Sequence, residues 1–455
     1  MARTRPRKRP MKSLLLCCAL VISGPTFAAS EILPVREQAR VIDEILAERL
    51  DTVLPDLMQR NGIDMWIVIS REYNEDPLLR TMLPATWLNA RRRTILVFAR
   101  SANDKYEKLA VARYNVGDRI TAAWDMQRFP QQWDALADIV TTRDPSKIAL
   151  DISTDFAHAD GLVKTDHDEL MRALPERFRS RVVSAQDLAV GWLETRTARE
   201  MQIYPQLVRI THAIIDEAFS ERVITPGITT SDDVVWWLRQ RVSDLGLDTW
   251  FHPTVSIQRD DGESFDHLKS FIDHPAGEII REGDLLHVDF GITYLRLNTD
   301  VQEHAYVLRP GESAVPAGIA KAMLKANRLQ DILTSQFAVG RSGNQILAGA
   351  LAQAKKEDIK ATIYTHPLGS HGHAAGPTIG MWDQQDGVPG SGDFPMHANT
   401  VYSIELNAAS DIPEWKKEIR IMLEQDGGFD GRTFRYLDGR QTRIHLIPRN
   451  GRAAE

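Results

Sequence analysis

The sequence predicts an α/β domain followed by an α+β domain with pseudo-twofold symmetry. In the first part of the chain, short apolar segments alternate with segments of helical spacing, which is typical of an α/β domain. A long helical segment follows from about residue 193, and after it the order helix, helix, strands occurs twice. No residue-level repeat relates these halves, so the symmetry is a prediction about topology alone. With 455 residues, the chain is long enough for two or three domains.

The α/β domain is expected over residues 31–190. Apolar residues between 37 and 60 follow helical spacing, and this segment closes at Asn61-Gly62. Strands are predicted at 65–69, 94–98 and 148–152, and a further helix at 161–174. The run of arginines at 91–93 is interpreted as a solvated edge or as a partner for buried acids, rather than as a nucleic-acid contact.

The α+β domain is expected over residues 195–450. After the long helical segment, helices are predicted at 231–245, 316–337 and 343–357, with strands between 252 and 308 and between 400 and 448. Thr230 is the expected N-cap of the helix that begins at 231.

Residues 1–28 have the pattern of a secretory signal peptide. Six basic residues and no acid precede a short apolar stretch, and Thr26-Phe27-Ala28 places small residues before a cleavage position. A retained membrane anchor is the alternative, but the apolar stretch is short and ends at Gly24-Pro25. We therefore expect an exported protein, periplasmic or secreted.

Removal of this leader changes the charge and the cysteine content. The formal charge of −7 becomes −13 because six positive residues are lost, and so acidic a protein is a poor partner for nucleic acid. Cys17 and Cys18 are lost as well, which excludes a disulfide or a thiol nucleophile in the mature chain. The interior of the chain contains no run of about 18 apolar residues, so no transmembrane helix is predicted there. No membrane association is therefore expected after cleavage.

Two aspartates of the second domain occupy positions where a carboxylate needs a partner. Asp289 lies in the apolar strand predicted at 285–290, on the face opposite most of its apolar side chains. Asp300 follows eleven residues later, beyond a segment at 291–298 that can form a hairpin. Paired strands would bring both carboxylates together, although turn chemistry alone also accounts for such a pair.

A histidine-rich loop and two glutamates extend the pattern. His366, His371 and His373 lie among glycine and proline, and Glu405 and Glu424 each interrupt an apolar strand. Taken singly, either glutamate could instead pair with a buried arginine or lysine. Together, four carboxylates and one histidine form an oxygen-rich ligand set that suits Mn²⁺, Co²⁺, Fe²⁺ or Zn²⁺, and four negative charges can neutralise two divalent ions.

The order Asp, Asp eleven residues later, His, Glu, Glu resembles the pita-bread metallopeptidases, which include methionine aminopeptidase, Xaa-Pro aminopeptidase and prolidase. The motifs HVDFG, NTD, SIEL and IMLEQD carry Asp289, Asp300, Glu405 and Glu424. His366 is predicted as the metal ligand because Leu-Gly follows shortly after it and His373 comes seven residues later, as in the family. The resemblance covers about 195–450, and the domain before it resembles the N-terminal domain of the Xaa-Pro and creatinase branch.

The resemblance implies a pita-bread catalytic domain and an exopeptidase of Xaa-Pro aminopeptidase or prolidase type. It implies two divalent metal ions, with Mn²⁺ favoured and Co²⁺, Zn²⁺ or Fe²⁺ as alternatives, on a small peptide substrate, in a homodimer. A hydroxide bridging the metals would attack the scissile carbonyl. Glu405 would be both ligand and proton acceptor, and His373 would donate to the developing oxyanion. The implied metal ligands are Asp289, Asp300, His366, Glu405 and Glu424.

Several positions depart from the family pattern and bear on specificity. Thr365 stands where the family has glycine, and Ala374 stands where it has an acid. His267 or His274 could match the family's upstream substrate histidine. Trp250 and Trp382 could line the cleft, or could simply pack. A metal-dependent lyase on the same fold is the alternative function, and an inactive binding module is a further one; the intact ligand set argues against a creatinase-type enzyme and against the inactive module.

Overall fold

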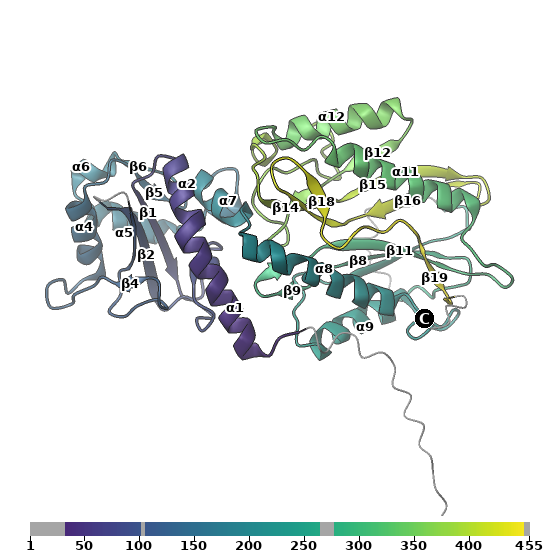
Figure 1. The fold of residues 1–455 in the computed structure, drawn as a ribbon, viewed down its shortest axis with the longest axis horizontal. Coiled ribbons are helices and arrows are strands. Elements are labelled where there is room, and N and C mark those ends of the chain that lie inside the picture. The colour runs from purple at the N-terminus through teal and green to yellow at the C-terminus, as the bar shows by residue number, and fades with distance from the viewer. Residues whose placement is uncertain (1–31, 102–104, 264–276, 450–455) are drawn as a thin grey trace, which may run out of the picture.

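The computed structural model describes residues 32–101, 105–263 and 277–449 (Figure 1). The predicted signal peptide at 1–28 and the two candidate substrate histidines, His267 and His274, lie outside the described residues. Within the described part of the chain, no helix is both long enough and apolar enough to cross a membrane.

The first domain is built on a six-stranded sheet with the order β4-β3-β2-β1-β5-β6. Its strands are β1 (Met65–Arg71), β2 (Arg93–Arg100), β3 (Tyr106–Ala110), β4 (Thr121–Ala122), β5 (Ile148–Leu150) and β6 (Val182–Ser184). The sheet is mixed, because β1 is antiparallel to β2 and parallel to β5. The three predicted strands are confirmed, and their side chains are almost entirely buried, as expected for a sheet covered on both faces.

Helices pack on both faces of this sheet (Figure 1). They are α1 (Val35–Glu48), α2 (Leu54–Arg60), α3 (Leu79–Met82), α4 (Gln132–Arg143), α5 (Lys164–Ala173), α6 (Glu176–Arg179) and α7 (Gln186–Glu194), with a π-helical segment at Arg49–Val53 between α1 and α2. Arg93, the last residue of the arginine run, forms ion pairs with the buried Asp166 at 3.0 Å and with Glu169 at 2.8 Å. For this residue, the prediction of a partner for buried acids is confirmed.

The second domain contains two successive helix pairs, each followed by strands, as predicted. The first set comprises α8 (Ala198–Ala218), α9 (Ser231–Asp244), β7 (Thr254–Gln258), β8 (Leu285–Phe290), β9 (Thr293–Tyr294), β10 (Leu297–Asn298) and β11 (Val301–Val307). The second set comprises α11 (Ala317–Thr334), α12 (Gly343–Lys356), β12 (Lys360–Ile363), β13 (His366–Pro367), β14 (Thr400–Ser403), β15 (Leu406–Ile412), β16 (Lys417–Leu423), β17 (Asp426–Phe429) and β18 (Phe434–Tyr436), and β19 (His445–Ile447) joins the first set.

Helices of each set cover their own strands. α11 and α12 contact β15, β16 and β12, whereas α8 and α9 contact β8, β11 and β7 (Figure 1). The two sets of strands meet at a backbone bridge between Gln302 and Glu424, where each N–H donates to the other carbonyl, at 3.0 and 3.4 Å. The pseudo-twofold arrangement therefore brings the strands of both halves to one central point.

One boundary differs from the prediction. The helix expected to begin at about 193 begins at Ala198 instead, because α7 ends at Glu194 and residues 195–197 form a break between α7 and α8. Thr197 ends the break because its hydroxyl accepts a hydrogen bond from the backbone of Glu200, whose carboxylate accepts one from the backbone of Thr197 in return. Thr230 caps α9 in the same way, as predicted.

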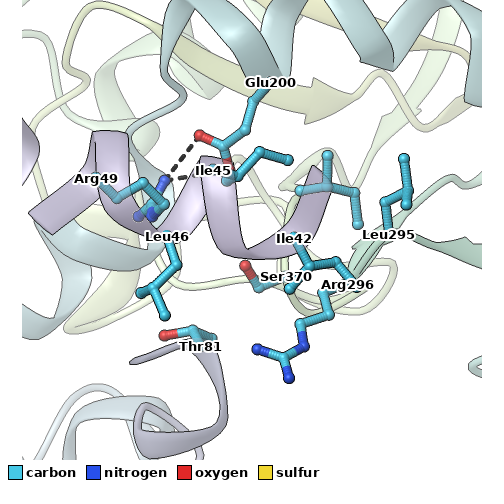
Figure 2. Close-up of a pocket in the computed structure, with 10 residues that line it drawn as sticks. Ile42, Ile45, Leu46, Arg49, Thr81, Glu200, Leu295, Arg296 and Ser370 are labelled. Carbon is cyan, nitrogen blue, oxygen red and sulfur yellow. Dashed lines mark hydrogen bonds and ion pairs between the residues drawn. The ribbon is translucent and has the colours of Figure 1, made fainter. Parts of the chain in front are cut away.

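A buried charge network joins the two domains at this break. Arg49, from the π-helical segment, donates to Glu200 of α8 at 2.9 Å, and Arg196 of the break donates to the other oxygen of Glu200 at 3.0 Å. All three residues are at most 4% exposed. Figure 2 shows Arg49 and Glu200 beside a cavity of about 30 Å³ at the junction, which has room for about one water molecule.

A hairpin tip forms a second bridge between the domains. Leu295 and Arg296 have positive φ angles of 54° and 63°, the geometry of a tight two-residue turn between β9 and β10. From this turn the guanidinium of Arg296 donates to three carbonyl oxygens near the end of α3, those of Arg80, Leu83 and Pro84. These bonds satisfy groups that a helix end leaves without intrahelical partners.

Replacement of the buried acid in the network should be costly. Glu200→Gln leaves Arg49 and Arg196 buried without a negative partner, which typically destabilises a protein by about 3–5 kcal/mol. Chemical denaturation followed by circular dichroism should show the midpoint falling accordingly. Glu37→Gln is the matched control, because Glu37 forms an exposed pair with Arg40 that should contribute about 0–1 kcal/mol. Equal midpoints for the two variants would contradict a stabilising role for the network.

Candidate metal centre

Asp289 lies in β8, and Asp300 directly precedes its antiparallel neighbour β11. Asp289 of β8 pairs directly with Gln302 of β11, and Asp300 comes two residues before Gln302. Since side chains alternate along a strand, Asp300 and Gln302 share a face, and that face is also the one that carries Asp289. The predicted hairpin between the two aspartates is present as β9 and β10.

Glu405 and Glu424 form the corresponding pair in the second half of the domain. Leu406 of β15 pairs with Leu423 of β16, so the same register places Glu405, one residue earlier, opposite Glu424, one residue later. Glu424 also takes part in the bridge to Gln302 that joins the two halves. The two carboxylate pairs therefore face each other across the centre of the domain.

His366 supplies the only nitrogen of the predicted ligand set. It begins β13, pairs with Ser403 of β14 and is 8% exposed. Its Nδ1 lies 2.9 Å from the carbonyl oxygen of Pro367, and because a carbonyl can only accept, Nδ1 carries the proton of this bond. The other nitrogen, Nε2, then faces the carboxylates, which is the orientation a metal ligand requires.

The five predicted residues converge on one space. Nε2 of His366 lies 3.4 Å from a carboxylate oxygen of Glu424, 3.6 Å from one of Asp300 and 3.9 Å from one of Glu405. Two groups have ligand atoms within 4.8 Å of one another, Asp289 with Asp300 and Glu424, and His366 with Glu405 and Glu424. The two groups share Glu424, so the five residues offer two adjacent sets of three candidate ligands.

The site also contains buried polar atoms that a cation would coordinate. In the described chain, Oδ1 of Asp289, Oδ1 of Asp300 and Nε2 of His366 are buried and accept or donate no hydrogen bond. Buried polar atoms without partners are rare in folded proteins, so three of them around one space indicate a missing ligand. Carboxylates and an imidazole suit a divalent transition metal, so the residues fit the two ions that the sequence predicts.

The electrostatics of the cluster lead to the same conclusion. Burial and the negative charge of Glu424 raise the pKa of Asp289, Asp300 and Glu405 well above their usual range. Burial alone would lower the pKa of His366, but the nearby negative charges of Glu424 and Glu405 raise it to about 9. These shifts show that the carboxylates lack nearby positive charge, which divalent cations would supply.

A glutamine that the sequence analysis overlooked orients the two glutamates. The side-chain amide of Gln302 donates to Glu405 at 2.6 Å and to Glu424 at 2.7 Å. His287 donates to the amide oxygen of Gln302 at 2.8 Å, which fixes the direction of that amide. Alternation along β11 could have identified Gln302, since it lies two residues after Asp300 on the same face.

Ser403 and Asp426 were also missed by the sequence analysis. The hydroxyl of Ser403 donates to Glu424 at 2.6 Å, and the carboxylate of Asp426 accepts from the backbone N–H of Asp300 at 3.2 Å. Both residues are fully buried and pair with each other between β14 and β17. These hydrogen bonds hold Glu424 and the backbone of Asp300 in place, although neither Ser403 nor Asp426 belongs to the predicted ligand set.

His373 lies at the edge of the cluster. Its ring makes an edge-on contact with His366, at 4.7 Å between centroids, and a nitrogen lies within 4.8 Å of ligand atoms of Asp300 and His366. Desolvation by its neighbours and the charge of His366 lower the pKa of His373 to about 4, although part of its surface is exposed. A neutral imidazole here can donate one hydrogen bond into the site or act as an additional ligand.

The two candidate tryptophans have different positions. The ring of Trp250 lies 5.2 Å from that of His373, and its indole N–H donates to the carbonyl of Thr299 at 2.9 Å. A Cβ at Gly372 would approach this ring to 2.3 Å, so only glycine allows the histidine loop to pack so closely. Trp250 therefore packs against the site, whereas Trp382 is 42% exposed near the turn at 381–384.

Comparison with known proteins agrees with the geometry. The sequence profile "Metallopeptidase family M24" matches residues 204–426, a segment that contains all five predicted ligands. No curated protein matches the sequence significantly.

Several solved structures share the whole fold. The X-Pro aminopeptidase of Thermotoga maritima is 15% identical, with a TM-score of 0.59 over 86% of this chain and 99% of that one. The Xaa-Pro dipeptidase of Bacillus anthracis is 14% identical, with a TM-score of 0.54 over 91% and 100%. The prolidase of Pyrococcus furiosus is 14% identical, with a TM-score of 0.51 over 85% and 100%. At these identities the likeness establishes the fold, an α/β domain followed by a pita-bread domain. Through the segment at 204–426, the chain belongs to metallopeptidase family M24.

Proposed function

We propose that this protein is a dinuclear-metal-dependent exopeptidase that acts on small peptides, of Xaa-Pro aminopeptidase or prolidase type. The observation that carries the proposal is the convergence of Asp289, Asp300, His366, Glu405 and Glu424, in two groups of three that share Glu424. Membership of family M24 supports a hydrolase that uses metal ions. Mn²⁺ is the favoured ion for this oxygen-rich set, with Co²⁺, Zn²⁺ or Fe²⁺ as alternatives.

The protein's own residues would divide the work between holding the ions and moving protons. Two bound divalent ions would polarise the scissile carbonyl and lower the pKa of an attacking water. Glu405 is suited to accept a proton because burial and the charge of Glu424 raise its pKa, and Gln302 holds one of its oxygens in place. The second oxygen of Glu405 remains directed toward His366.

His373 is suited to stabilise negative charge on the reacting carbonyl oxygen. Its imidazole is neutral at neutral pH and lies at the rim of the cluster, so it can donate a hydrogen bond without adding charge to the cage. Packing against Trp250 fixes the orientation of the ring. A nitrogen of His373 lies within 4.8 Å of ligand atoms of Asp300 and His366. His373 is therefore the alternative to His366 as the histidine ligand of a metal ion.

A panel of dipeptides, with and without proline at the second position, tests the function directly. The protein loaded with Mn²⁺ should release free amino acids, and removal of the metal with a chelator should abolish the release. Hydrolysis of proline-containing dipeptides alone would define a prolidase-type preference. A protein that binds two metals yet cleaves no peptide would contradict the proposal and favour the lyase alternative.

Substitutions of Glu405 and His373 should separate metal binding from turnover. Glu405→Ala removes a ligand, so both metal content and activity should fall. His373→Ala should keep two metals per chain by elemental analysis while kcat falls by about 10²–10³, the usual loss for one oxyanion donor. Metal depletion in His373→Ala would show that His373 is a ligand, and near-normal activity would leave it only a packing role.

Metal binding should release protons at neutral pH. His366, with a pKa of about 9 in the metal-free site, is protonated at pH 7.5 and must lose that proton to bind an ion through Nε2. Titration calorimetry of Mn²⁺ into metal-free protein should therefore give different heats in two buffers of unlike ionisation enthalpy. The difference should shrink above about pH 9, where His366 is already neutral. Identical heats in both buffers at pH 7.5 would refute this linkage.

A further inference from the structure

A histidine of α8 approaches the metal centre from the opposite side of its strands. Gln302 and Glu303 are consecutive residues of β11, so their side chains point to opposite faces of the sheet. Gln302 faces the candidate ligands, whereas an oxygen of Glu303 lies 3.9 Å from Nε2 of His212 on α8, which packs on β8 and β11 (Figure 1). His212 therefore lies behind the strands that carry the metal cluster, outside the cluster itself.

Both ring nitrogens of His212 face groups that can only accept a hydrogen bond. Nδ1 lies 3.0 Å from a carboxylate oxygen of Asp438, and Nε2 lies 3.0 Å from the side-chain oxygen of Gln425. The Gln425 amide has this orientation because its NH2 group donates to the main-chain carbonyl of Gln302, at 3.4 Å. A histidine that donates from both nitrogens carries a positive charge, so the geometry selects the imidazolium form of His212.

Acidic groups outnumber basic groups among the neighbours of this imidazolium. Burial lowers the pKa of His212, but the hydrogen bond to Asp438 and the charge of Glu303 outweigh burial and raise the pKa above its ordinary value. The surroundings therefore favour the charge that the hydrogen bonds require. The charged or titratable groups that face His212 or its partners are Asp438 after β18, Glu303 on β11, His445 on β19, Asp426 on β17, and Arg209 and Asp216 on α8.

Gln425 connects His212 to the backbone bridge that joins the two halves of the domain. The carbonyl of Gln302 accepts from the Gln425 side chain and from the backbone N–H of Glu424, both at 3.4 Å. Gln425 is fully buried, and Glu424 belongs to both groups of candidate ligands. The direction of the Gln425 amide therefore bears on the position of the ligand that the two groups share.

Loss of the proton on Nε2 would break this arrangement. A neutral imidazole has one N–H, and Asp438 would retain it, because a hydrogen bond to a carboxylate is stronger than one to an amide oxygen. The lone pair of Nε2 would then face the oxygen of Gln425, which places two acceptors in contact. Rotation of the amide would relieve this contact, but it would also remove the donor from the carbonyl of Gln302.

We propose that His212 is a positioning residue for the metal centre, which in its protonated form holds Gln425 and, through it, the backbone bridge at Glu424. The inference rests on the metal centre of the proposed function, but it concerns the binding of ions and not the cleavage of peptides. Because the pKa of His212 is raised, its contribution to metal affinity is present at acidic pH and is lost as the pH rises through that pKa.

A ratio of metal affinities isolates this contribution. The Kd of Mn²⁺ is measured by titration calorimetry between about pH 6 and pH 9 for the wild-type protein and for His212→Asn, whose amide stands in for Nδ1 of the ring and leaves Gln425 without a donor. Deprotonation of the metal ligands affects both proteins equally, so the ratio of the two Kd values removes it. At pH 6 the variant should bind Mn²⁺ about 10-fold more weakly, the usual loss for a residue that orients a metal ligand, and the ratio should approach one at high pH. His167→Asn is the matched control, since this histidine of the first domain pairs with Asp168 at 3.3 Å, and its ratio should be one throughout.

Two further variants test the route of the effect, with folding checked by circular dichroism. Asp438→Asn removes the charge that favours protonation of His212, so metal affinity should be lost at a lower pH than in the wild-type protein. This variant keeps the test decisive if His212→Asn does not fold, because the Asp438 side chain is 23% exposed. In a Gln425→Met background, exchange of His212 for asparagine should no longer change the Kd, because the connecting amide is gone.

The outcomes separate this role from the proposed peptidase activity. A Kd ratio that does not change with pH, or a pH dependence that is the same in Asp438→Asn as in the wild-type protein, would overturn the role of His212. Absence of peptide cleavage together with the expected changes in Mn²⁺ affinity would overturn the hydrolase and leave the role of His212 standing. Absence of Mn²⁺ binding would overturn both.

Discussion

The crowding of four carboxylates around one histidine is the constraint on which the rest of the second domain depends. Asp289, Asp300, Glu405 and Glu424 approach one another in a buried space, where like charges repel strongly. Neutral donors such as Gln302 and Ser403 offset part of this repulsion, and the crowding raises the pKa of the acids and of His366. Divalent cations would neutralise these charges, so the crowding favours metal binding.

The strand pairing is the device that makes this crowding possible. An antiparallel register fixes each carboxylate pair. In one half Asp289 lies opposite Gln302, two residues after Asp300, and in the other half Glu405 lies opposite Glu424. The backbone bridge between Gln302 and Glu424 then locks the two halves together at the same point. Asp289 and His366 lie in strands, and the other three candidate ligands directly adjoin strands or lie one residue from them. Ligands anchored in this way are placed more accurately than ligands in the middle of loops.

The domain junction extends this rigidity to the histidine loop. The guanidinium of Arg196 lies 3.1 Å from the position of a Cβ at Gly369, so this loop packs directly on the buried network with Glu200 and Arg49. The carbonyl of Gly369 accepts two hydrogen bonds from Asn298, two residues before Asp300. Arg49 of the first domain, the histidine loop and the aspartate strand are therefore parts of one packed unit, and the first domain supports the site.

The sequence by itself determined the class of fold and the helix and strand order of the second domain, because these features are periodic. The carboxylates were conspicuous among apolar residues, and the resemblance to a known family completed the set of five with His366. Only the tertiary structure decided that Gln302 and His287 orient the glutamates, that Arg196 supports the histidine loop, and that His212 contacts Gln425 behind the metal centre. Those contacts join residues far apart in the chain, as His212 and Gln425 are, and no local pattern specifies which surfaces will meet once the domains pack.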